Sequence, residues 1–132
     1  MRLEFVRDIK ASWGEVPTIT VEMEYLGGIL SVNRFKYQGR YTRPETKKWM
    51  AELAFIIRVT ANCAEVRFKP PVKVRIDGVF KNNRSRPDID NLFKCVNDAV
   101  SDGIGLNDKD FINESGVSQI GDPCLTITVS QA

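Results

Sequence analysis

The chain has 132 residues, 42% of them apolar and 27% charged, which suits one folded domain and is too apolar for a disordered chain. It contains no histidine, which excludes a Ser-His-Asp triad, a histidine general base and a histidine-containing zinc site. The three cysteines, Cys63, Cys95 and Cys124, form no CxxC motif, and we expect them to be reduced thiols that fill the core. Any catalysis would therefore rely on carboxylates, lysine, arginine, hydroxyls or a metal ion.

The net charge of +2 hides a polarity along the chain. Residues 1–33 carry three basic and five acidic side chains, residues 34–86 fourteen and four, and residues 87–132 two and eight. Such a pattern indicates a polyanion-binding surface beside an acid-lined site, although chance clustering on a solvated surface produces the same counts. The longest apolar run, 53–57, is too short for a membrane span, and the N-terminus does not read as a signal peptide. We therefore expect no membrane segment and a cytoplasmic location.

In the first half of the chain, residues 10–17 contain Trp13, Gly14 and Pro17 and are expected to form a connection. Residues 18–25 alternate between apolar and polar side chains, which predicts a half-buried strand. Residues 44–63 show helical spacing of apolar side chains and start with a proline, which suits the first turn of a helix.

Residues 66–76 are expected to be extended, with an interruption at Pro70-Pro71. Asp77-Gly78 is a turn signal, and residues 81–86 form a polar, basic loop.

A second helix is predicted from about Asp88 to Asp102, with Gly103 as its stop. Strands are expected near 111–120 and at 125–129. Two main helices among about five short strands predict a single domain over residues 1–132, of the α/β class in the broad sense: an α+β fold with a mixed sheet.

The second helix has one apolar stripe, which we expect to face the core: Ile89, Leu92, Phe93, Val96, Ala99 and Val100. Asp90 and Lys94 share a flank beside that stripe, with Asn97 between them in angle. Asp98 is predicted to lie on the opposite, solvated side.

Asp88 and Asp90 form an acidic pair at the start of this helix. Helix capping explains such a pair, and so does a site for a hard divalent cation, since Mg²⁺ takes oxygen ligands and retains several waters. Asp108 and Asp110 follow the helix and also suit ordinary turn chemistry. Lys94 alone would be a solvated helix lysine. The combination of these residues favours a catalytic metal site.

The segment RPDIDNLFKCVNDAV followed by GIGLNDKD resembles the signature of the RusA family of Holliday junction resolvases. The upstream segment LSVNRFKYQGRYTRPETKKWMAEL resembles the Ser-x-Asn element, basic loop and helix of that family. The resemblance spans roughly residues 17–129, so residues 1–16 form an extension that is atypical of the family.

The resemblance implies catalytic aspartates at Asp88, Asp90 and Asp108, a catalytic lysine at Lys94, and a RusA-like fold. It also implies a homodimer that requires Mg²⁺ or Mn²⁺, nicks four-way DNA junctions symmetrically, and is often encoded by phages. Asn107 stands where the family often has another acid, and Asp110 is a second candidate for the third metal ligand.

The expected mechanism follows from this ligand set. We expect Asp88, Asp90 and Asp108 to bind one or two Mg²⁺ ions at the scissile phosphate, where the metal activates a water for in-line attack and neutralises the leaving oxygen. Lys94 is expected to stabilise charge that develops in the transition state or to position the water.

The basic middle of the chain is expected to contact DNA phosphates. Aromatic residues Tyr37 and Tyr41 in this region either stack on bases of an opened junction or pack normally. The expected DNA-binding residues are Asn33, Arg34, Lys36, Arg40, Arg43, Lys47, Lys73, Arg75, Lys81, Arg84 and Arg86.

Two other functions remain open at this point. A DNA-binding module with a purely structural acidic pair would bind junctions without cleaving them. A metal-dependent phosphohydrolase acting on a nucleotide would share the acids, but it has little use for the basic middle. Paired nicks need two active sites, so the resolvase hypothesis also requires a dimer, for which residues 111–129 offer apolar strand-like candidates.

Overall fold

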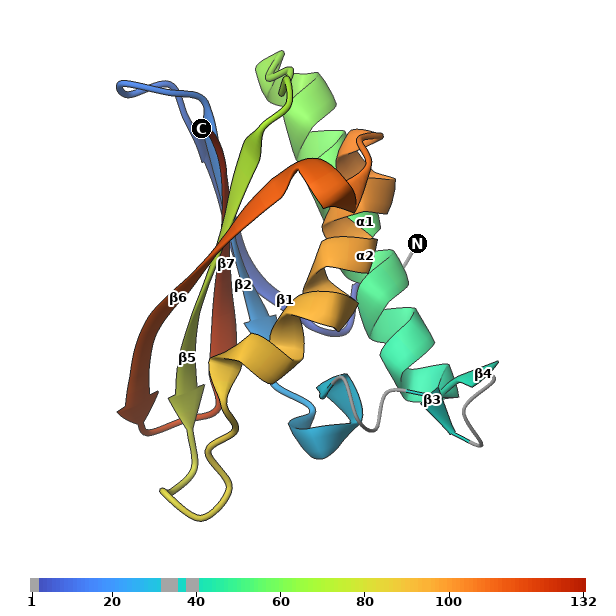
Figure 1. The fold of residues 1–132 in the computed structure, drawn as a ribbon, viewed down its shortest axis with the longest axis vertical. Helices are drawn as coiled ribbons and strands as arrows, with labels where there is room; N and C mark the ends of the chain where they lie inside the picture. The colour runs from blue at the N-terminus through green and yellow to red at the C-terminus, as the bar shows by residue number, and fades with distance from the viewer. Residues whose placement is uncertain (1–2, 32–35, 38–40) are drawn as a thin grey trace.

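The computed structural model describes residues 3–31, 36–37 and 41–132, which form one layer of sheet packed on one layer of helices (Figure 1). None of the described helices is long and apolar enough to cross a membrane. In chain order the elements are β1 (Val6–Ser12), β2 (Thr18–Glu24), the 3₁₀ turn η1 (Gly27–Leu30), β3 (Lys36–Tyr37), β4 (Tyr41–Thr42), α1 (Pro44–Ala64), β5 (Val72–Phe80), η2 (Ile89–Leu92), α2 (Phe93–Ile104), η3 (Asp108–Asp110), β6 (Phe111–Ile120) and β7 (Cys124–Gln131).

The main sheet has five strands in the order β1-β2-β7-β5-β6, and β3 pairs with β4 in a separate small hairpin. β5 and β6 pair in parallel, whereas the other neighbouring strands of the main sheet are antiparallel. β2, β5 and β6 consequently run in the same direction and end at the same end of the sheet. The predicted mixed α+β fold with two main helices is confirmed.

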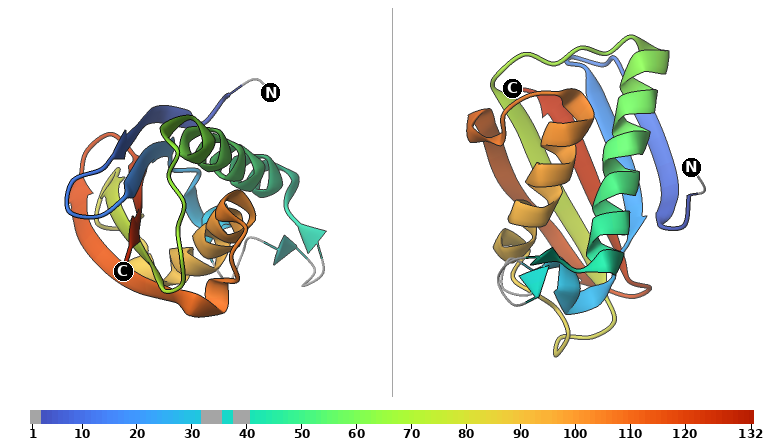
Figure 2. Two further views of the ribbon diagram at one scale, coloured as in Figure 1. Left: turned by 90° about the horizontal axis from the view of Figure 1, so that it is seen from above. Right: turned by 90° about the vertical axis from the view of Figure 1, so that its right-hand side faces the viewer.

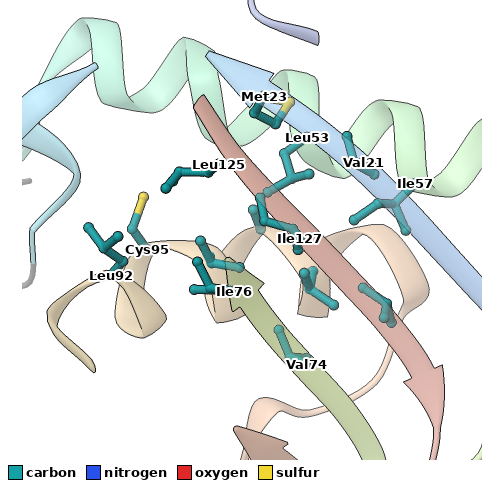
Figure 3. Close-up of a cluster of buried hydrophobic side chains, with 14 of the residues drawn as sticks. Val21, Met23, Leu53, Ile57, Val74, Ile76, Leu92, Cys95, Leu125 and Ile127 are labelled. Carbon is teal, nitrogen blue, oxygen red and sulfur yellow. The ribbon is translucent and has the colours of Figure 1, made fainter. Parts of the chain in front are cut away.

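Both helices cover the same face of the sheet and leave its other face open (Figure 2). α1 connects β2 to β5, and α2 connects β5 to β6, so each helix forms a crossover between parallel strands. The buried core lies between these layers, with aliphatic side chains contributed by β2, β5, β7 and both helices (Figure 3). The apolar stripe predicted for the second helix is buried throughout, as expected.

Alternating patterns predicted the inner strands well. Ile19, Val21 and Met23 on β2 are fully buried, and so are Leu125, Ile127 and Val129 on β7. The predicted strand near 111–120 corresponds to β6, and the helix predicted over 44–63 corresponds to α1.

Residues 10–17 do not form only a connection, because residues 10–12 belong to β1. This strand lies at the edge of the sheet, and most of its side chains are exposed, so it lacks the alternation that marks an inner strand. Its start is anchored by Glu52, a buried residue of α1 whose Oε1 accepts the N–H groups of Phe5 at 2.8 Å and Val6 at 2.9 Å. Part of the N-terminal extension therefore has a structural role.

Asp77-Gly78 is not a turn, because both residues lie inside β5. The pairing with β6 shifts register between Ile76 and Gly78, so the polar pair marks a bulge in a continuous strand. Residues 66–71 precede β5 and are not part of it.

Three smaller predictions were also wrong. Gly103 lies inside α2 and is buried, and the helix ends at Ile104, followed by Gly105 in the left-handed conformation with φ of 73°. Cys63 is exposed and does not fill the core, unlike Cys95 and Cys124. The prediction that Asp98 lies on the opposite, solvated side of the helix was wrong too, because Asp98 is half-buried and its carboxylate forms an ion pair with Lys94.

Candidate active site

Asp88 and Asp90 lie where the chain passes from the loop after β5 into η2. Asp88 is the extended residue that caps η2, and its Oδ1 accepts the backbone N–H of Asp90 at 3.1 Å. The capping role is therefore present, but it occupies only one carboxylate oxygen of the pair. Both residues are exposed, so the remaining oxygens are accessible to a ligand.

Ser115 of β6 contacts the same acidic pair. Its Oγ lies 2.6 Å from Asp90 Oδ1 and donates a hydrogen bond to it, which ties η2 to the edge strand. The amino-acid sequence contains no signal for this contact, because Ser115 lies 25 positions further along the chain. The hydroxyl fixes one oxygen of Asp90 and leaves the other oxygen free to face solvent.

Asp88 and Asp90 have no Lys or Arg within ion-pair distance among the described residues. Two exposed carboxylates, two residues apart and without a cationic partner among the described residues, offer oxygen ligands to a cation. Mg²⁺ is commonly held by one or two carboxylates together with waters and substrate phosphate oxygens. The pair therefore suits one part of a divalent-metal site.

Lys94 lies one turn beyond Asp90 on α2. Its Nζ is 3.2 Å from Asp98 Oδ1, and half of its side chain is exposed. Asp98 also lines an open cleft of about 420 Å³ between α1 and α2, together with Lys47 and Asp102. The structure thus places Lys94 near the acidic pair along the helix, with its charge currently balanced by Asp98.

Asp108 and Asp110 lie at the other end of α2, in η3 (Figure 2). Asn107 caps this turn by accepting the N–H of Lys109 at 3.0 Å. α2 has 12 residues, so it separates the two acidic pairs by about 18 Å of helix. From Asp110 to Ser115 the chain runs another five positions, about 16 Å along β6.

A metal ion shared by Asp88, Asp90 and Asp108 of one chain does not fit this geometry. Ligand oxygens of Mg²⁺ lie about 2.1 Å from the ion, so they must also lie close to one another. In residues 3–31, 36–37 and 41–132 no group of three acidic or cysteine side chains is close enough to hold a metal. One chain brings together Asp88 and Asp90, and it holds Asp108 and Asp110 apart from them.

Cysteine chemistry is disfavoured near this site. Cys95 follows Lys94 on α2 and is buried, and burial raises the pKa of its thiol to about 12, with a further contribution from the charge of Asp98. A thiol with this pKa stays protonated at neutral pH and is a poor nucleophile.

The predicted DNA-binding residues that lie nearest to Asp88 are in the loop between β5 and η2. Lys81, Arg84 and Arg86 are all exposed on this loop, which projects from the end of the sheet where β5 finishes (Figure 1). The carboxyl ends of parallel strands are the usual place for ligand sites in open sheets. The basic loop and the Asp88–Asp90 pair therefore share one end of the molecule.

The other predicted DNA-binding residues of the first half are less well defined. Asn33, Arg34 and Arg40 lie outside the described residues, and Lys36 is described only as part of β3. Arg43 precedes α1 at its N-cap, and Lys47 is exposed on the first turns of the same helix. β3, β4 and the start of α1 lie at the same end of the molecule as the basic loop (Figure 1).

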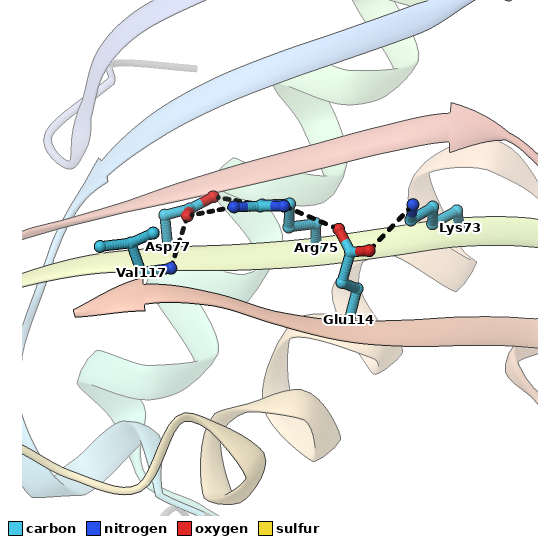
Figure 4. Close-up of polar contacts among 5 residues, drawn as sticks. All are labelled: Lys73, Arg75, Asp77, Glu114 and Val117. Carbon is cyan, nitrogen blue, oxygen red and sulfur yellow. Dashed lines mark hydrogen bonds and ion pairs between the residues drawn. The ribbon is translucent and has the colours of Figure 1, made fainter.

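Lys73 and Arg75 lie on the open face of the sheet, away from α2. Arg75 contacts Asp77 at 3.0 and 3.1 Å and Glu114 at 2.9 Å, and Lys73 Nζ lies 3.0 Å from Glu114 Oε1 (Figure 4). The hydrogen bonds from Lys73 and Arg75 lower the pKa of Glu114. The structure therefore gives these two basic residues acidic partners within the protein.

Asp77 completes this cluster and also stabilises the bulge between β5 and β6. Its Oδ1 accepts the N–H of Val117 at 2.7 Å, across the register shift between β5 and β6. Burial of the carboxyl raises its pKa, but the hydrogen bonds from Arg75 and Val117 outweigh this effect, and the pKa is lowered overall. A Cβ atom on Gly116 would lie 2.1 Å from Asp77 Oδ1, so this contact requires a glycine there.

Comparison with known proteins identifies the family to which the chain belongs. No curated protein matches the chain. Among solved structures, the OmpA-like domain of FopA1 from Francisella tularensis subsp. tularensis SCHU S4 is similar over 98% of this chain and 82% of that chain, at 11% identity and a TM-score of 0.45. That likeness is too weak to carry an argument. Residues 31–130, in contrast, match the family described as "Endodeoxyribonuclease RusA", and this match contains both acidic pairs, Lys94 and the basic loop. The chain therefore belongs to the RusA family of endodeoxyribonucleases.

Proposed function

We propose that this protein is a Mg²⁺-dependent Holliday junction resolvase that cuts four-way DNA junctions by paired nicks. The observation that carries the proposal is the exposed Asp88–Asp90 pair, which lacks a cationic partner among the described residues and lies beside the basic loop at one end of a RusA-family domain. Carboxylates that bind a cation and basic side chains that bind phosphates are the two parts a metal-dependent nuclease requires.

In this proposal Asp88 and Asp90 hold Mg²⁺, with Mn²⁺ as a substitute, next to the scissile phosphate. When bound, the metal ion supplies Lewis-acid stabilisation of the phosphate and a water of lowered pKa. Ser115 keeps the Asp90 carboxylate in place, and Lys94 neutralises developing negative charge after release from Asp98. Lys81, Arg84 and Arg86 hold the DNA backbone through phosphate contacts.

The third carboxylate comes from a second copy of the chain. Asp108 and Asp110 are about 18 Å of helix away from Asp88 and Asp90 within one chain, so they cannot complete the same metal site. In a symmetric dimer, each subunit would contribute the acids of its η3 turn to the metal site of the other subunit, so that both metal sites would be complete. Two such sites would give one nick in each of two strands.

Cleavage of a synthetic four-way junction tests this function. We expect nicks in two opposed strands near the crossover in Mg²⁺, no cleavage in EDTA, and no comparable cleavage of linear duplex. Asp90→Asn should reduce the rate by about a hundredfold or more, because it removes a carboxylate charge from the metal site. Asp122→Asn is the matched control, since Asp122 is exposed and pairs with Arg7 at the surface.

Two results would contradict the proposal. Tight junction binding without cleavage in Mg²⁺ or Mn²⁺ would identify a binding module, with Asp88 acting only as a cap. Full cleavage by folded Asp90→Asn would show that the catalytic site lies elsewhere.

A further inference from the structure

We propose that the cleft between α1 and α2 binds one unstacked nucleotide of the DNA, with its base in the cleft and its phosphate on Lys47. This inference rests on the proposed function for its substrate, branched DNA, and adds a binding site that the metal chemistry does not use. The cleft is formed by described residues of β4, α1 and α2 and does not include the Asp88–Asp90 pair.

The cleft has the size of a small-ligand site. It lies between two helices that run side by side on the sheet (Figure 2), and its volume is about 420 Å³. Met50 and Ala51 line it from α1, and Asp98 and Asp102 line it from α2. Tyr41 of β4, which is 58% exposed, also contributes to the lining. Ligand pockets range upward from about 300 Å³, so this cleft has room for a single nucleotide.

The charges around the cleft favour an anionic ligand. Asp98 Oδ1 lies 3.2 Å from Lys94 Nζ, so this acid already has a basic partner. Asp102 Oδ1 likewise lies 3.5 Å from Arg58 Nη2. Lys47 has no acidic side chain within ion-pair distance in the part of the chain that the structure describes. The unbalanced charge of the lining is therefore positive, which suits a DNA phosphate.

The remaining lining suits a nucleobase. The exposed ring of Tyr41 offers a surface for stacking, and Met50 and Ala51 offer apolar contact to a flat base. Asp98 and Asp102 each have a second carboxylate oxygen outside the two ion pairs. Carboxylate oxygens accept hydrogen bonds from amino groups of bases. The cleft therefore fits a base that carries an exocyclic amino group.

The cleft is also close to the candidate active site. Lys94 lies one helical turn after Asp90 and one turn before Asp98, with which it pairs. Eight residues separate Asp90 from Asp98, which corresponds to about 12 Å of helix. A strand with a phosphate at Asp90 can therefore continue past Lys94 and place a nearby base in the cleft.

The fluorescence of 2-aminopurine tests this site without cleavage. This base analogue carries an amino group, and stacking in DNA quenches its fluorescence. It replaces, one at a time, the nucleotides at the centre of a synthetic four-way junction, and wild-type protein is added in EDTA. At one position the fluorescence should rise about twofold or more, because the base leaves the stack.

Two pairs of variants assign the rise to the cleft. Ala51→Phe fills the cleft from an exposed position and should abolish the rise, whereas Val59→Phe, at an exposed position of α1 outside the cleft, should preserve it. Lys47→Ala should raise the protein concentration needed for half of the rise about tenfold, because a charged phosphate contact is lost. Lys48→Ala is its matched control, since Lys48 is exposed but does not line the cleft. Circular dichroism confirms that each variant is folded.

The identity of the base provides a second measurement. At the responding position, thymine should lower the affinity of the wild-type protein about fivefold relative to adenine, because thymine has no amino group to donate to Asp98 or Asp102. Ala51→Phe should bind both junctions equally. Equal affinities of the wild-type protein for the two junctions would overturn the proposed contact with the amino group.

The outcome is separable from that of the proposed function. An undiminished rise in Ala51→Phe, or junction binding by wild type with no rise at any position, would overturn the cleft site even if the protein nicks junctions. A rise that Ala51→Phe abolishes, in a protein that never cleaves in Mg²⁺, keeps the cleft site and rejects the nuclease function. A protein that does not bind the junction at all rejects both.

Discussion

Two charged clusters lie on either side of β6, and they differ in how their charges are balanced. On the open face of the sheet, Asp77 and Glu114 are each bonded to Arg75, and Glu114 also pairs with Lys73. On the helix side, Asp90 contacts the Ser115 hydroxyl, and Asp88 caps a backbone N–H, with no cation beside either among the described residues. In the first cluster each acid has a basic partner, whereas in the second we propose that a cation supplies the missing positive charge.

This difference distinguishes a structural role from a functional one more clearly than residue type does. Lys73 and Arg75 belong to the basic middle of the chain and were expected to bind DNA, but both already have acidic partners. Asp88 and Asp90 looked like ordinary helix caps, yet capping uses only part of their hydrogen-bonding capacity.

The largest expected effect is at the far end of α2. Asp108→Asn should slow junction cleavage by about a hundredfold, as severely as a change at Asp90, because both residues would serve the same metal site in a dimer. Asp110→Asn should have the smaller effect of the two, and cleavage time courses with both variants decide which acid is used. Full activity of Asp108→Asn and Asp110→Asn would contradict the shared site.

The basic loop should contribute more to DNA affinity than the ion-paired cluster of Lys73, Arg75, Asp77 and Glu114 on the open face of the sheet. Replacing Lys81, Arg84 and Arg86 together with alanine should reduce the slope of log K against log salt by about 2.7, since each lost phosphate contact contributes about 0.9. Lys73→Ala should leave the slope nearly unchanged, because Glu114 already neutralises this lysine. Fluorescence anisotropy with a junction at several salt concentrations measures both, and equal slopes for all proteins would refute the contrast.

Ser115 should act as a positioning residue for Asp90. Ser115→Ala should raise the Mg²⁺ concentration needed for half-maximal cleavage by about tenfold, because outer hydrogen bonds orient metal ligands. Ser115→Thr keeps a hydroxyl and should restore most of the affinity. Ser118→Ala, on the same strand, serves as the control. An unchanged Mg²⁺ dependence in Ser115→Ala would remove Ser115 from the site.

The smallest effect concerns stability at acid pH. The pKa of Asp77 is lowered in the folded protein, so this carboxylate stabilises the fold above the usual aspartate pKa of about 3.9. That stabilisation, on the order of 1 kcal/mol, is lost as the pH falls through the lowered folded-state pKa. The free energy of unfolding, measured in urea, should therefore fall more steeply below pH 4 for the wild-type protein than for Asp77→Asn. If the free energies of unfolding of the two proteins depended on pH in the same way, Asp77 would not stabilise the fold through its contacts with Arg75 and Val117.

Periodic elements could be predicted from the sequence because burial imposes their pattern. β2, β7 and α2 each have a face buried in the core, so apolar residues recur with period two or along one helical stripe. β1 escaped prediction because an edge strand with exposed side chains has no such period. Asp77-Gly78 resembled a turn because the same residue types suit turns and bulges, and only strand pairing distinguishes them.

The residues of the site could be named from the sequence, but their distances could not. The spacing from Asp90 to Asp108 suits a site in one chain as well as a site between two chains. Only the length of α2 and the direction of β6 show that one chain separates them. Nothing in the sequence indicated that Ser115 belongs to the site, because its contact with Asp90 depends on how η2 and α2 pack beside β6.

The most direct test of the shared site mixes two inactive proteins. Asp90→Asn and Asp108→Asn are combined, allowed to exchange subunits, and assayed on a four-way junction in Mg²⁺. A mixed dimer contains one intact site, built from Asp88 and Asp90 of one subunit and the partner's Asp108, so we predict that the mixture recovers nicking at one strand per junction. If every site lies within one chain, each subunit of the mixed dimer carries a defect. A mixture as inactive as its two components would then contradict the account.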